Sequence, residues 1–435
     1  MRMKKALAAV LAVCLLLLAT ACTKNTEETS RPVQKTLRIT YDGSLYGTNW
    51  MDSVSKAFSK AHPDIALKIT ADNHLTQHYT ALLQSGPNTP DLIFLARTNW
   101  QQDASAGLLA NLNTLYTGSG GGTPLLTELR AGVAASCALN GQYYIYPWGA
   151  QTGGLLYHAN LFAQNGWQVP QTMSAFATLC TQIRQTGLSP FAWSADHADD
   201  WTDNVATWWT QYEGQASIQT YLSMQSPDVY GQQGRLVGLQ AFEQLVPQNS
   251  YGTPLTMNQD AAVKAFSAGH AAMMPIGYLS AFAADTSQEN TDIRVMPLPA
   301  PDGSKSAALL AAYIPGIAVV PAKAAAPSLA QTFLSDLTSD EELALFISAT
   351  GTPTPFLLDK KQENALPRLL KSAADLWQGD TLYMLSTQPV YYQRLFDWPA
   401  QGSPVLQIFS GSRTADQAFA ENLEAARACW TNAGS

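Results

Sequence analysis

Apolar positions near the start of the folded part of the chain first alternate with polar ones and then recur every three or four residues. Alternation predicts β-strands, and the longer recurrence predicts amphipathic helices. One predicted helix carries Trp50, Val54 and Phe58 on a single face, which assigns Trp50 to the core. The predicted elements are a strand at 36–40, a helix from Trp50 to Ala61, a strand at 65–69, a helix at 77–84 and a buried strand at 91–95. This β-α-β-α-β order is typical of an α/β domain.

The middle of the chain, about 155–275, has a different pattern that predicts mostly helices. Strand-like and helical signals both return after it. They are strands at 293–296 and 317–320, a helix after Pro327, a helix opened by a capping box of Ser339 and Glu342, and a helix over 413–430. Since the chain leaves an α/β unit, returns to it and leaves again, we predict two lobes joined by more than one crossing. A cleft between such lobes is a common place for a ligand.

The start of the chain predicts a secretory signal peptide over 1–21. Positive residues at Arg2, Lys4 and Lys5 precede an apolar run at 6–18. That run is too short to span a bilayer, which needs about 20 residues. We therefore expect this segment to direct export.

The end of the leader resembles a bacterial lipobox. Residues 18–22 read Leu-Ala-Thr-Ala-Cys, although Ala19 stands where leucine is usual. This resemblance predicts lipidation of Cys22, and the polar stretch at 22–35 predicts a flexible tether. The protein is then expected on the outer face of the cell membrane. Ordinary secretory cleavage near Ala21, which leaves Cys22 as a free thiol, is the alternative.

Composition changes this picture in two ways. The 435 residues, 46% of them hydrophobic, are too many for one core and enough for two substantial domains. The formal net charge is −8, and the leader holds only positive charges, so the mature part is more acidic still. No long basic run occurs, so we expect no nucleic-acid partner.

Aromatic residues are abundant, with 11 Trp and 17 Tyr against 13% charged residues. Their flat apolar faces and polar edges complement a sugar ring, which has an apolar face and a rim of hydroxyls. Counts alone favour burial of most of them in the core. The pair Trp208 and Trp209 points to opposite sides of a helix, so one of the two is expected in the core.

Three cysteines lie outside the leader and the lipobox, at Cys137, Cys180 and Cys429. An odd number cannot pair fully within one chain, and no C-x-x-C spacing suggests zinc or thioredoxin-like chemistry. Export permits a disulfide, and Cys137 with Cys180 is one possible pair. Buried free thiols are the favoured state.

Five segments, in order, resemble the extracellular solute-binding proteins of ABC sugar importers, the maltose-binding-protein-like group. They are 39–43 (ITYDG) with Phe58 and 62–65 (HPDI), 90–94 (PDLIF), 142–148 (QYYIYPW) with 154–162 (GLLYHANLF), 266–278 (FSAGHAAMMPIGY), and 408–411 (IFSG) with 414–419 (TADQAF). The His-Ala-Asn at 158–160 departs from the usual Tyr-Asn-Lys. The order and spacing of the segments cover nearly all of the mature chain.

The resemblance implies an α/β two-lobe periplasmic-binding-protein fold, type II-like, with interleaved domains and a hinge. Lobe 1 is expected to contain 36–146 and about 278–325, and lobe 2 about 147–277 and 326–435. The implied function is capture of a mono- or oligosaccharide between closing lobes, followed by delivery to the permease subunits of an ABC importer. The protein is expected to be a monomer without a cofactor or a metal, and not an enzyme.

Candidate ligand-binding residues lie at predicted strand ends, where open α/β sheets bind ligands, and in loops that match the family. Those after the first three strands are Tyr46, Asn73, His74, Arg97, Asn99 and Trp100. Those at the crossings and in the later loops are Trp148, Gln151, Tyr278, Tyr313, Gly316, Trp377 and Trp398. Trp148 and Tyr278 are the leading candidates.

Two enzymatic alternatives stay open. Thiamine-degrading transferases share the binding-protein fold and use a cysteine nucleophile, for which Cys137 is the candidate. No base accompanies Cys137 locally, and a thiolate needs one. A glycoside hydrolase needs two carboxylates across a cleft, and Asp199, Asp200 and Asp203 are close together in sequence. They fit a solvated or ligand-facing loop better than a matched acid and base.

Other solutes are the stronger alternative. Adjacent tyrosines bind iron(III) in some carriers, and this chain has the pairs Tyr143–Tyr144 and Tyr391–Tyr392. A polyamine site would be lined by strong acids, and a peptide is a further possibility. Abundant aromatic residues with few charges favour a neutral sugar.

Overall fold

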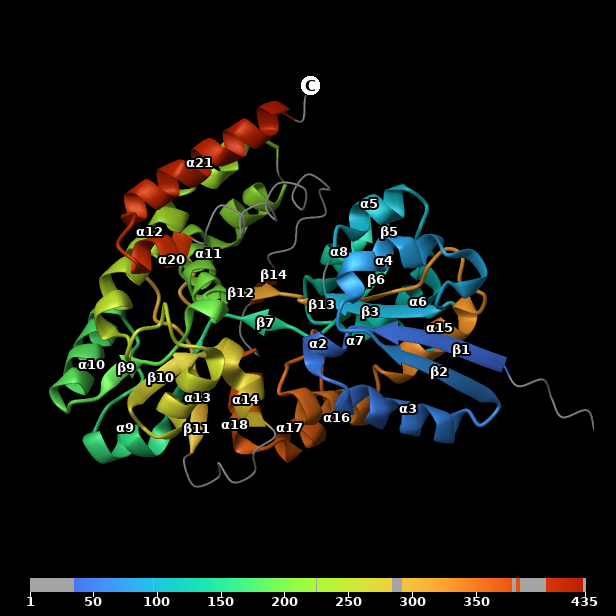
Figure 1. The fold of residues 1–435 in the computed structure, drawn as a ribbon, viewed down its shortest axis with the longest axis horizontal. Helices are drawn as coiled ribbons and strands as arrows, with labels where there is room; N and C mark the ends of the chain where they lie inside the picture. Colours follow the sequence, from blue (N-terminus) through green and yellow to red (C-terminus); the bar gives the residue numbers. More distant parts are fainter. Residues whose placement is uncertain are drawn as a thin grey trace, which may run out of the picture.

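The computed structural model describes residues 35–96, 98–223, 225–283, 292–377, 381–383 and 404–432. These residues form two lobes joined by a narrow middle region, with lobe 1 on the right and lobe 2 on the left of Figure 1. Cys22, Arg97 and Trp398 lie outside the described residues, as do Tyr391 and Tyr392. Within the described part, no helix has the length and apolar character needed to cross a membrane.

Lobe 1 is built on a five-stranded sheet of order β2-β1-β3-β13-β6. Its strands are β1 (Lys35–Tyr41), β2 (Ile65–Ala71), β3 (Leu92–Ala96), β6 (Ile145–Trp148) and β13 (Gly316–Val319). The first three run parallel, and β13 enters antiparallel between β3 and β6. The helices of this lobe are α2 (Gly43–Tyr46), α3 (Asn49–Ala61), α4 (Leu75–Gln84), α5 (Trp100–Ser105), α6 (Asn113–Thr117), α7 (Leu125–Glu128), α8 (Val133–Ser136), α15 (Pro327–Asp336) and α16 (Asp340–Thr350). A small hairpin, β4 (Ala138–Leu139) with β5 (Gln142–Tyr143), completes it.

Lobe 2 is built on a four-stranded sheet of order β11-β8-β10-β9. Its strands are β8 (Leu155–His158), β9 (Ser189–Phe191), β10 (Ala271–Pro275) and β11 (Ile293–Met296). Its helices are α9 (Ala159–Asn165), α10 (Met173–Gln185), α11 (Asp199–Leu222), α12 (Gln233–Leu245), α13 (Gln259–Ser267), α14 (Ser280–Ala283), α18 (Arg368–Leu376), α20 (Pro404–Phe409) and α21 (Ala415–Asn432). The long helix α11 packs against α12, which in turn packs against α21 (Figure 1).

A third, three-stranded sheet lies between the lobes. It consists of β7 (Gln151–Thr152), β12 (Leu310–Tyr313) and β14 (Thr381–Tyr383), in the order β14-β12-β7. Within the described residues the chain crosses between the lobes three times: through β7, back through β12, and out again between α16 and α18 by way of α17 (Lys360–Ala365). The prediction of two interleaved α/β lobes is therefore confirmed.

The predicted division between the lobes needs correction in two places. The sequence placed about 278–325 in lobe 1, but β11 pairs with β8 at the edge of the lobe 2 sheet. It placed 326–435 in lobe 2, but α15 and α16 pack on lobe 1, where the rings of Phe58 and Phe333 lie 4.9 Å apart. Strand pairing and ring packing across hundreds of residues decide both placements, and local periodicity carries no information about either.

Individual elements agree well with the sequence pattern. The five elements predicted over 36–95 are present as β1, α3, β2, α4 and β3, and the strands and helices predicted after 290 are present as β11, β13, α15, α16 and α21. The predicted capping box is formed, because Ser339 Oγ accepts a hydrogen bond from the Glu342 amide at 3.4 Å. The helical middle region also contains β8, β9 and β10, which the pattern did not reveal.

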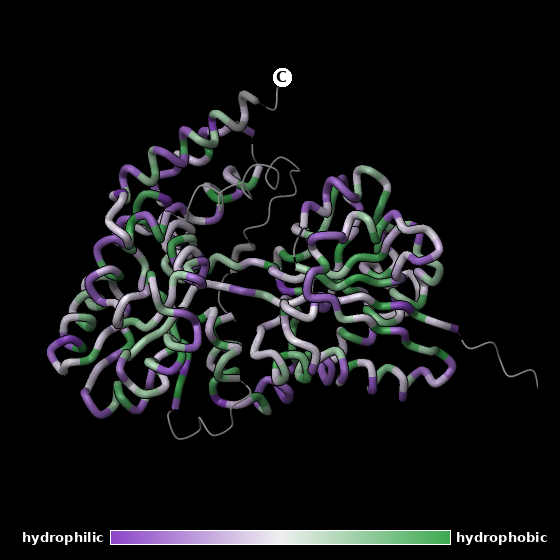
Figure 2. Tube along the Cα trace, in the orientation of Figure 1, coloured by the Kyte–Doolittle hydropathy of each residue, from purple (hydrophilic) through white to green (hydrophobic). Residues whose placement is uncertain are grey.

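Aromatic residues form the centre of each lobe. In lobe 1, Trp50, Trp148 and Phe346 pack together, with the Trp148 and Phe346 rings 4.3 Å apart. In lobe 2, Trp193 and Trp201 pack around Phe242. Figure 2 shows apolar segments along the inner strands and polar ones on the outer helices and loops. Both members of the pair Trp208 and Trp209 are buried, where one was expected.

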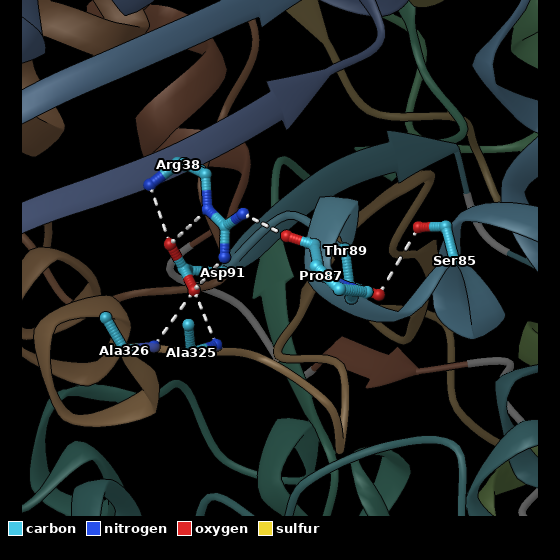
Figure 3. A network of polar contacts seen from close by, with 7 residues as sticks. All are labelled: Arg38, Ser85, Pro87, Thr89, Asp91, Ala325 and Ala326. Carbon is cyan, nitrogen blue, oxygen red and sulfur yellow. Dashed lines mark hydrogen bonds and ion pairs between the residues drawn. The ribbon is translucent and has the colours of Figure 1, made fainter.

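One buried carboxylate ties three distant segments of lobe 1 together. Asp91, just before β3, is fully buried and accepts hydrogen bonds from the Arg38 backbone N–H at 2.9 Å and from the Arg38 guanidinium. It also accepts from the N–H groups of Ala325 and Ala326, at 2.8 and 2.9 Å, just before α15 (Figure 3). The Arg38 guanidinium donates to the Pro87 carbonyl as well. Asp91 therefore fixes the middle of β1 and the start of β3 against the chain that returns from the second crossing.

We predict that Asp91→Ala lowers the free energy of unfolding by about 3 kcal/mol, because it leaves several buried donors and one guanidinium without their acceptor. Urea unfolding followed by circular dichroism measures this. Asp64→Ala, at an exposed position after α3, is the matched control and is expected to change stability little. A loss for Asp91→Ala no larger than that of the control contradicts the prediction.

Candidate functional site

A cleft of about 430 Å³ lies where the two lobes meet. Lobe 1 contributes α2 with Gly47 and the end of α16 with the following residues 351–353, while lobe 2 contributes Ile276, Gly277, Leu279 and Ser280. The crossing segment 150–152, Pro315 and Trp377 complete the lining. Its volume falls within the range of ligand sites in proteins, roughly 300 to 1,000 Å³.

The described side chains that line this cleft carry no formal charge. Their polar members are Tyr46, Gln151, Thr152, Ser280, Thr350, Thr352 and Trp377. Hydroxyl, amide and indole groups hydrogen-bond to neutral polar ligands, and the two aromatic residues add apolar faces. The arrangement is therefore suited to an uncharged polar solute.

Tyr46 reaches the cleft because of its local structure. The Asp42 carboxylate caps α2 by accepting from the Ser44 N–H at 2.9 Å, which starts the short helix that ends at Tyr46. The Tyr46 hydroxyl donates to the Trp148 carbonyl at 3.0 Å, and its ring meets the edge of Phe346. A Cβ on Gly149 would lie 2.1 Å from the Tyr46 hydroxyl oxygen, so only glycine permits this approach.

Gln151 lies in the crossing strand β7, opposite Tyr313 of β12. Its side-chain amide donates to Asp203 of α11 at 2.5 Å. One residue further along, the Thr152 hydroxyl donates to the Ala311 carbonyl. The crossing strand is thus fixed to both β12 and α11.

A second carboxyl group of α11, Asp200, is buried behind the cleft wall. It is 7% exposed, and its Oδ2 atom has no hydrogen-bond partner among the described residues. A Cβ on Gly277, a residue that lines the cleft, would lie 1.8 Å from Asp200 Oδ1. Burial, with a smaller contribution from the Asp199 charge, raises the pKa of Asp200 to about 8.

The structure brings three of the predicted site residues to the cleft lining: Tyr46, Gln151 and Trp377. Tyr313 and Gly316 lie beside them, the first paired with Gln151 and the second close to the Tyr46 hydroxyl. Arg130 of lobe 1 donates to the Trp377 carbonyl at 3.0 Å, which helps to hold Trp377 at the junction of the lobes.

The other described candidates do not line the cleft. Trp100, Trp148 and Tyr278 are buried in their lobes. The Tyr278 hydroxyl bonds Ser194, and burial raises the pKa of Tyr278 to about 12, although the bonds to Ser194 work in the opposite direction. Asn73 and His74 are exposed beyond β2, and the Asn99 amide donates to Gln102. Sequence reasoning missed Thr350 and Thr352, although the run of Thr, Gly and Pro at 350–355 marks a loop there.

The buried cysteines do not resemble nucleophiles. Cys137 is fully buried, and burial raises its pKa to about 12, although a hydrogen bond with Tyr116 works in the opposite direction. A reactive thiol needs a lowered pKa and access to substrate. Cys137 and Cys180 are both free thiols, so the bridge between them is not formed, as the sequence favoured.

The iron alternative gains no geometric basis from the described residues. Tyr143 stacks face to face on Tyr116 with ring centres 3.9 Å apart. In the described part of the chain, His, Cys, Asp and Glu side chains do not gather in groups of three that could hold a metal ion.

Asp200 gives the site a testable pH dependence. Its folded pKa lies above the unfolded value of about 3.9, so between roughly pH 4 and pH 8 the folded state holds a proton that the unfolded state has lost. The free energy of unfolding must therefore fall as pH rises through this window. We predict that Asp200→Asn removes this part of the fall and is more stable than the wild type at pH 8.

Urea unfolding at pH 5 and pH 8 tests this, with the difference between variant and wild type isolating Asp200 from other titrating groups. Asp260→Asn, at an exposed position in the first turn of α13, is the control. Equal pH dependence in the wild type and in Asp200→Asn rules the interpretation out.

Comparison with known proteins gives a consistent picture. A family model described as bacterial extracellular solute-binding protein matches residues 53–367, more than two thirds of the chain. A search of curated protein sequences gave no significant match.

Three solved structures illustrate the fold similarity. The solute receptor AcbH, described as exclusive for β-D-galactopyranose, has 16% identity over 92% of this chain and 99% of its own, with a TM-score of 0.68. RafE in complex with raffinose has 18% identity over 90% and 98%, with a TM-score of 0.66. The GacH receptor of Streptomyces glaucescens GLA.O, solved with and without acarbose, has 15% identity over 91% and 98%, with a TM-score of 0.68. At these identities the likeness establishes the two-lobe fold.

Proposed function

The chain belongs to the bacterial extracellular solute-binding proteins, and we propose that it captures a neutral mono- or oligosaccharide between its lobes. It then delivers the sugar, chemically unaltered, to the permease subunits of an ABC importer. It acts as a monomer on the outer face of the membrane.

The observation that carries this proposal is the chemistry of the interlobe cleft. Its described lining combines hydroxyl and amide groups with the rings of Tyr46 and Trp377, and it contains no formal charge. A sugar offers hydroxyls for the first set and an apolar ring face for the second. Because both lobes contribute, a bound sugar stabilises the closed arrangement relative to an open one.

The ligands of structurally similar proteins support the choice of solute. AcbH, RafE and GacH have the same fold, and the ligands named for them are galactopyranose, raffinose and acarbose. A polyamine needs acidic side chains in contact with it, and the described lining offers none. The family and these neighbours are binding proteins, and the buried state of Cys137 gives no support to a cysteine-based enzyme.

Within the proposed site, Tyr46, Gln151 and Trp377 contact the sugar, with Tyr313 and Gly316 shaping the wall beside them. Trp148 and Tyr278 serve as buried supports beneath the lining. Cys22 carries the lipid that holds the protein beside its permease.

We predict that at least one sugar in a panel of D-galactose, raffinose, acarbose, xylotriose and chitotriose binds the protein and changes its tryptophan emission. Trp377→Ala should weaken that binding by about 1–3 kcal/mol and remove most of the emission change, because the ring lines the cleft. Isothermal titration calorimetry and fluorescence titration measure the two effects.

Trp430→Ala, in helix α21 and outside the cleft lining, is the matched control. It should leave both the affinity and the emission change in place. Failure of a broad sugar panel to bind, or formation of a converted product during incubation, overturns the proposed function.

A separate prediction concerns the anchor. Cys22→Ser should release the protein from the membrane fraction, because the lipid has no attachment point without the thiol. Fractionation of expressing cells followed by immunoblotting measures this, and Cys180→Ser, at a buried position in lobe 2, is the control. Retention of the Cys22 variant at the membrane contradicts lipid anchoring.

A further inference from the structure

Several hydroxyl groups around the cleft already donate their hydrogen to the protein. Tyr46 donates to the Trp148 carbonyl at 3.0 Å, Thr152 to the Ala311 carbonyl at 2.8 Å and Thr350 to the Phe346 carbonyl at 2.8 Å. A hydroxyl has one hydrogen but two lone pairs. These three groups therefore keep only acceptor capacity for a solute, and Thr350 already uses one lone pair to accept from the Thr352 N–H at 3.0 Å. Ser280 and Thr352 add hydroxyls that line the cleft from other segments.

The side chain of Gln151 likewise uses its donor on the protein and keeps its acceptor available to a solute. An amide has an NH₂ group that donates and an oxygen that accepts, and coordinates alone rarely distinguish the two. Here the neighbour decides, because the Asp203 carboxylate at 2.5 Å only accepts hydrogen bonds. The NH₂ group must face Asp203, and the Oε1 atom must face away from it.

The position of the Gln151 side chain is fixed from two directions. Its backbone pairs with Tyr313 in the connecting sheet, and its NH₂ group is held by α11. The residue is half-buried and lines the cleft, and no donor among the described residues bonds its Oε1 atom. An amide oxygen held in this way is a preorganised acceptor.

We propose that Asp203 orients Gln151 so that the amide oxygen faces the cleft, and that the crossing side of the cleft recognises a solute by the hydrogens it donates. This inference deepens the proposed function and rests on it. Asp203 is a positioning residue, since it acts through Gln151 and not by touching the solute.

The proposal defines a solute class. Sugar hydroxyls satisfy such a wall because each carries a hydrogen to donate. Anionic sugars, such as sugar phosphates and uronic acids, offer mainly acceptors at their charged groups and meet no described cation in the lining. The site should therefore prefer a sugar to its phosphorylated or oxidised derivative.

A double-mutant cycle tests the role of Asp203. With the tightest-binding sugar of the five-member panel as probe, Asp203→Asn should lower affinity about 3- to 10-fold, because the amide is then free to turn. Gln151→Leu should lower affinity by a similar factor. If Asp203 acts through Gln151, adding Asp203→Asn to Gln151→Leu should cause no further loss.

Asp199→Asn, an exposed acid one turn before Asp203 in α11, is the matched control and should leave affinity unchanged. Multiplicative losses in the double variant, as expected from a merely structural role, overturn the proposal. Equal affinity for the sugar and its phosphate overturns the assigned solute class.

A measurement without sugar separates this inference from the proposed function. The side-chain amide signal of Gln151 in a ¹⁵N–¹H spectrum is identified by its absence in Gln151→Leu. It should shift in Asp203→Asn and stay in place in Asp199→Asn. An unmoved signal overturns the orienting role of Asp203. Failure of every sugar to bind overturns the proposed function, and the spectrum then still tests whether Asp203 orients Gln151.

Discussion

The buried carboxylate of Asp91 is the contact on which the arrangement of lobe 1 depends. Asp91 lies at the start of β3 and bonds the middle of β1, 53 residues away in the sequence, and the turn before α15, more than 230 residues away. Strand β13 can enter the sheet between β3 and β6 only if the chain returns from lobe 2 at this place. Each return requires a crossing, and the crossings form one wall of the cleft. The location of the site thus follows from how the first lobe is closed.

The need of buried polar groups for hydrogen-bond partners explains why the cleft wall is uncharged and yet prefers solutes that donate hydrogen bonds. Buried polar groups must find partners, so the hydroxyls of Tyr46 and Thr350 satisfy carbonyl groups of their own lobe. The same bonds remove their hydrogens from the cleft and leave oxygen lone pairs. Asp203 has the equivalent effect on Gln151 through a charged acceptor. The same hydrogen bonds therefore stabilise the wall and give it a preference for solutes that donate hydrogen bonds.

The sequence predicted the elements better than the direction of their side chains. Helix and strand periodicity located α3, β2 and α16, because local patterning records which face is buried. It could not decide which aromatic residues face the cleft. Trp148 ends a strand, as a ligand-stacking residue could, but packing against Phe346 turns its ring into the core. Tyr278 is retained in lobe 2 by Ser194, a partner 84 residues away. Contacts of that range leave no trace in local sequence.

Long-range hydrogen bonds also show where, along the first crossing, the chain passes from lobe 1 to lobe 2. From Gln151 onward the chain is hydrogen-bonded to helix α11 of lobe 2, since Asp203 accepts from the Gln151 amide and Asn204 accepts from the Gly154 N–H at 2.8 Å. Up to Trp148 it belongs to the lobe 1 sheet, paired with β13. Residues 149–150 follow, where the Ala150 N–H donates to the Pro353 carbonyl after α16 at 2.8 Å and Gly149 has a φ of +77°, which glycine adopts without strain. The bonds to lobe 1 therefore end at Ala150 and those to lobe 2 begin at Gln151, so the boundary between the lobes in the first crossing falls between two residues that line the cleft.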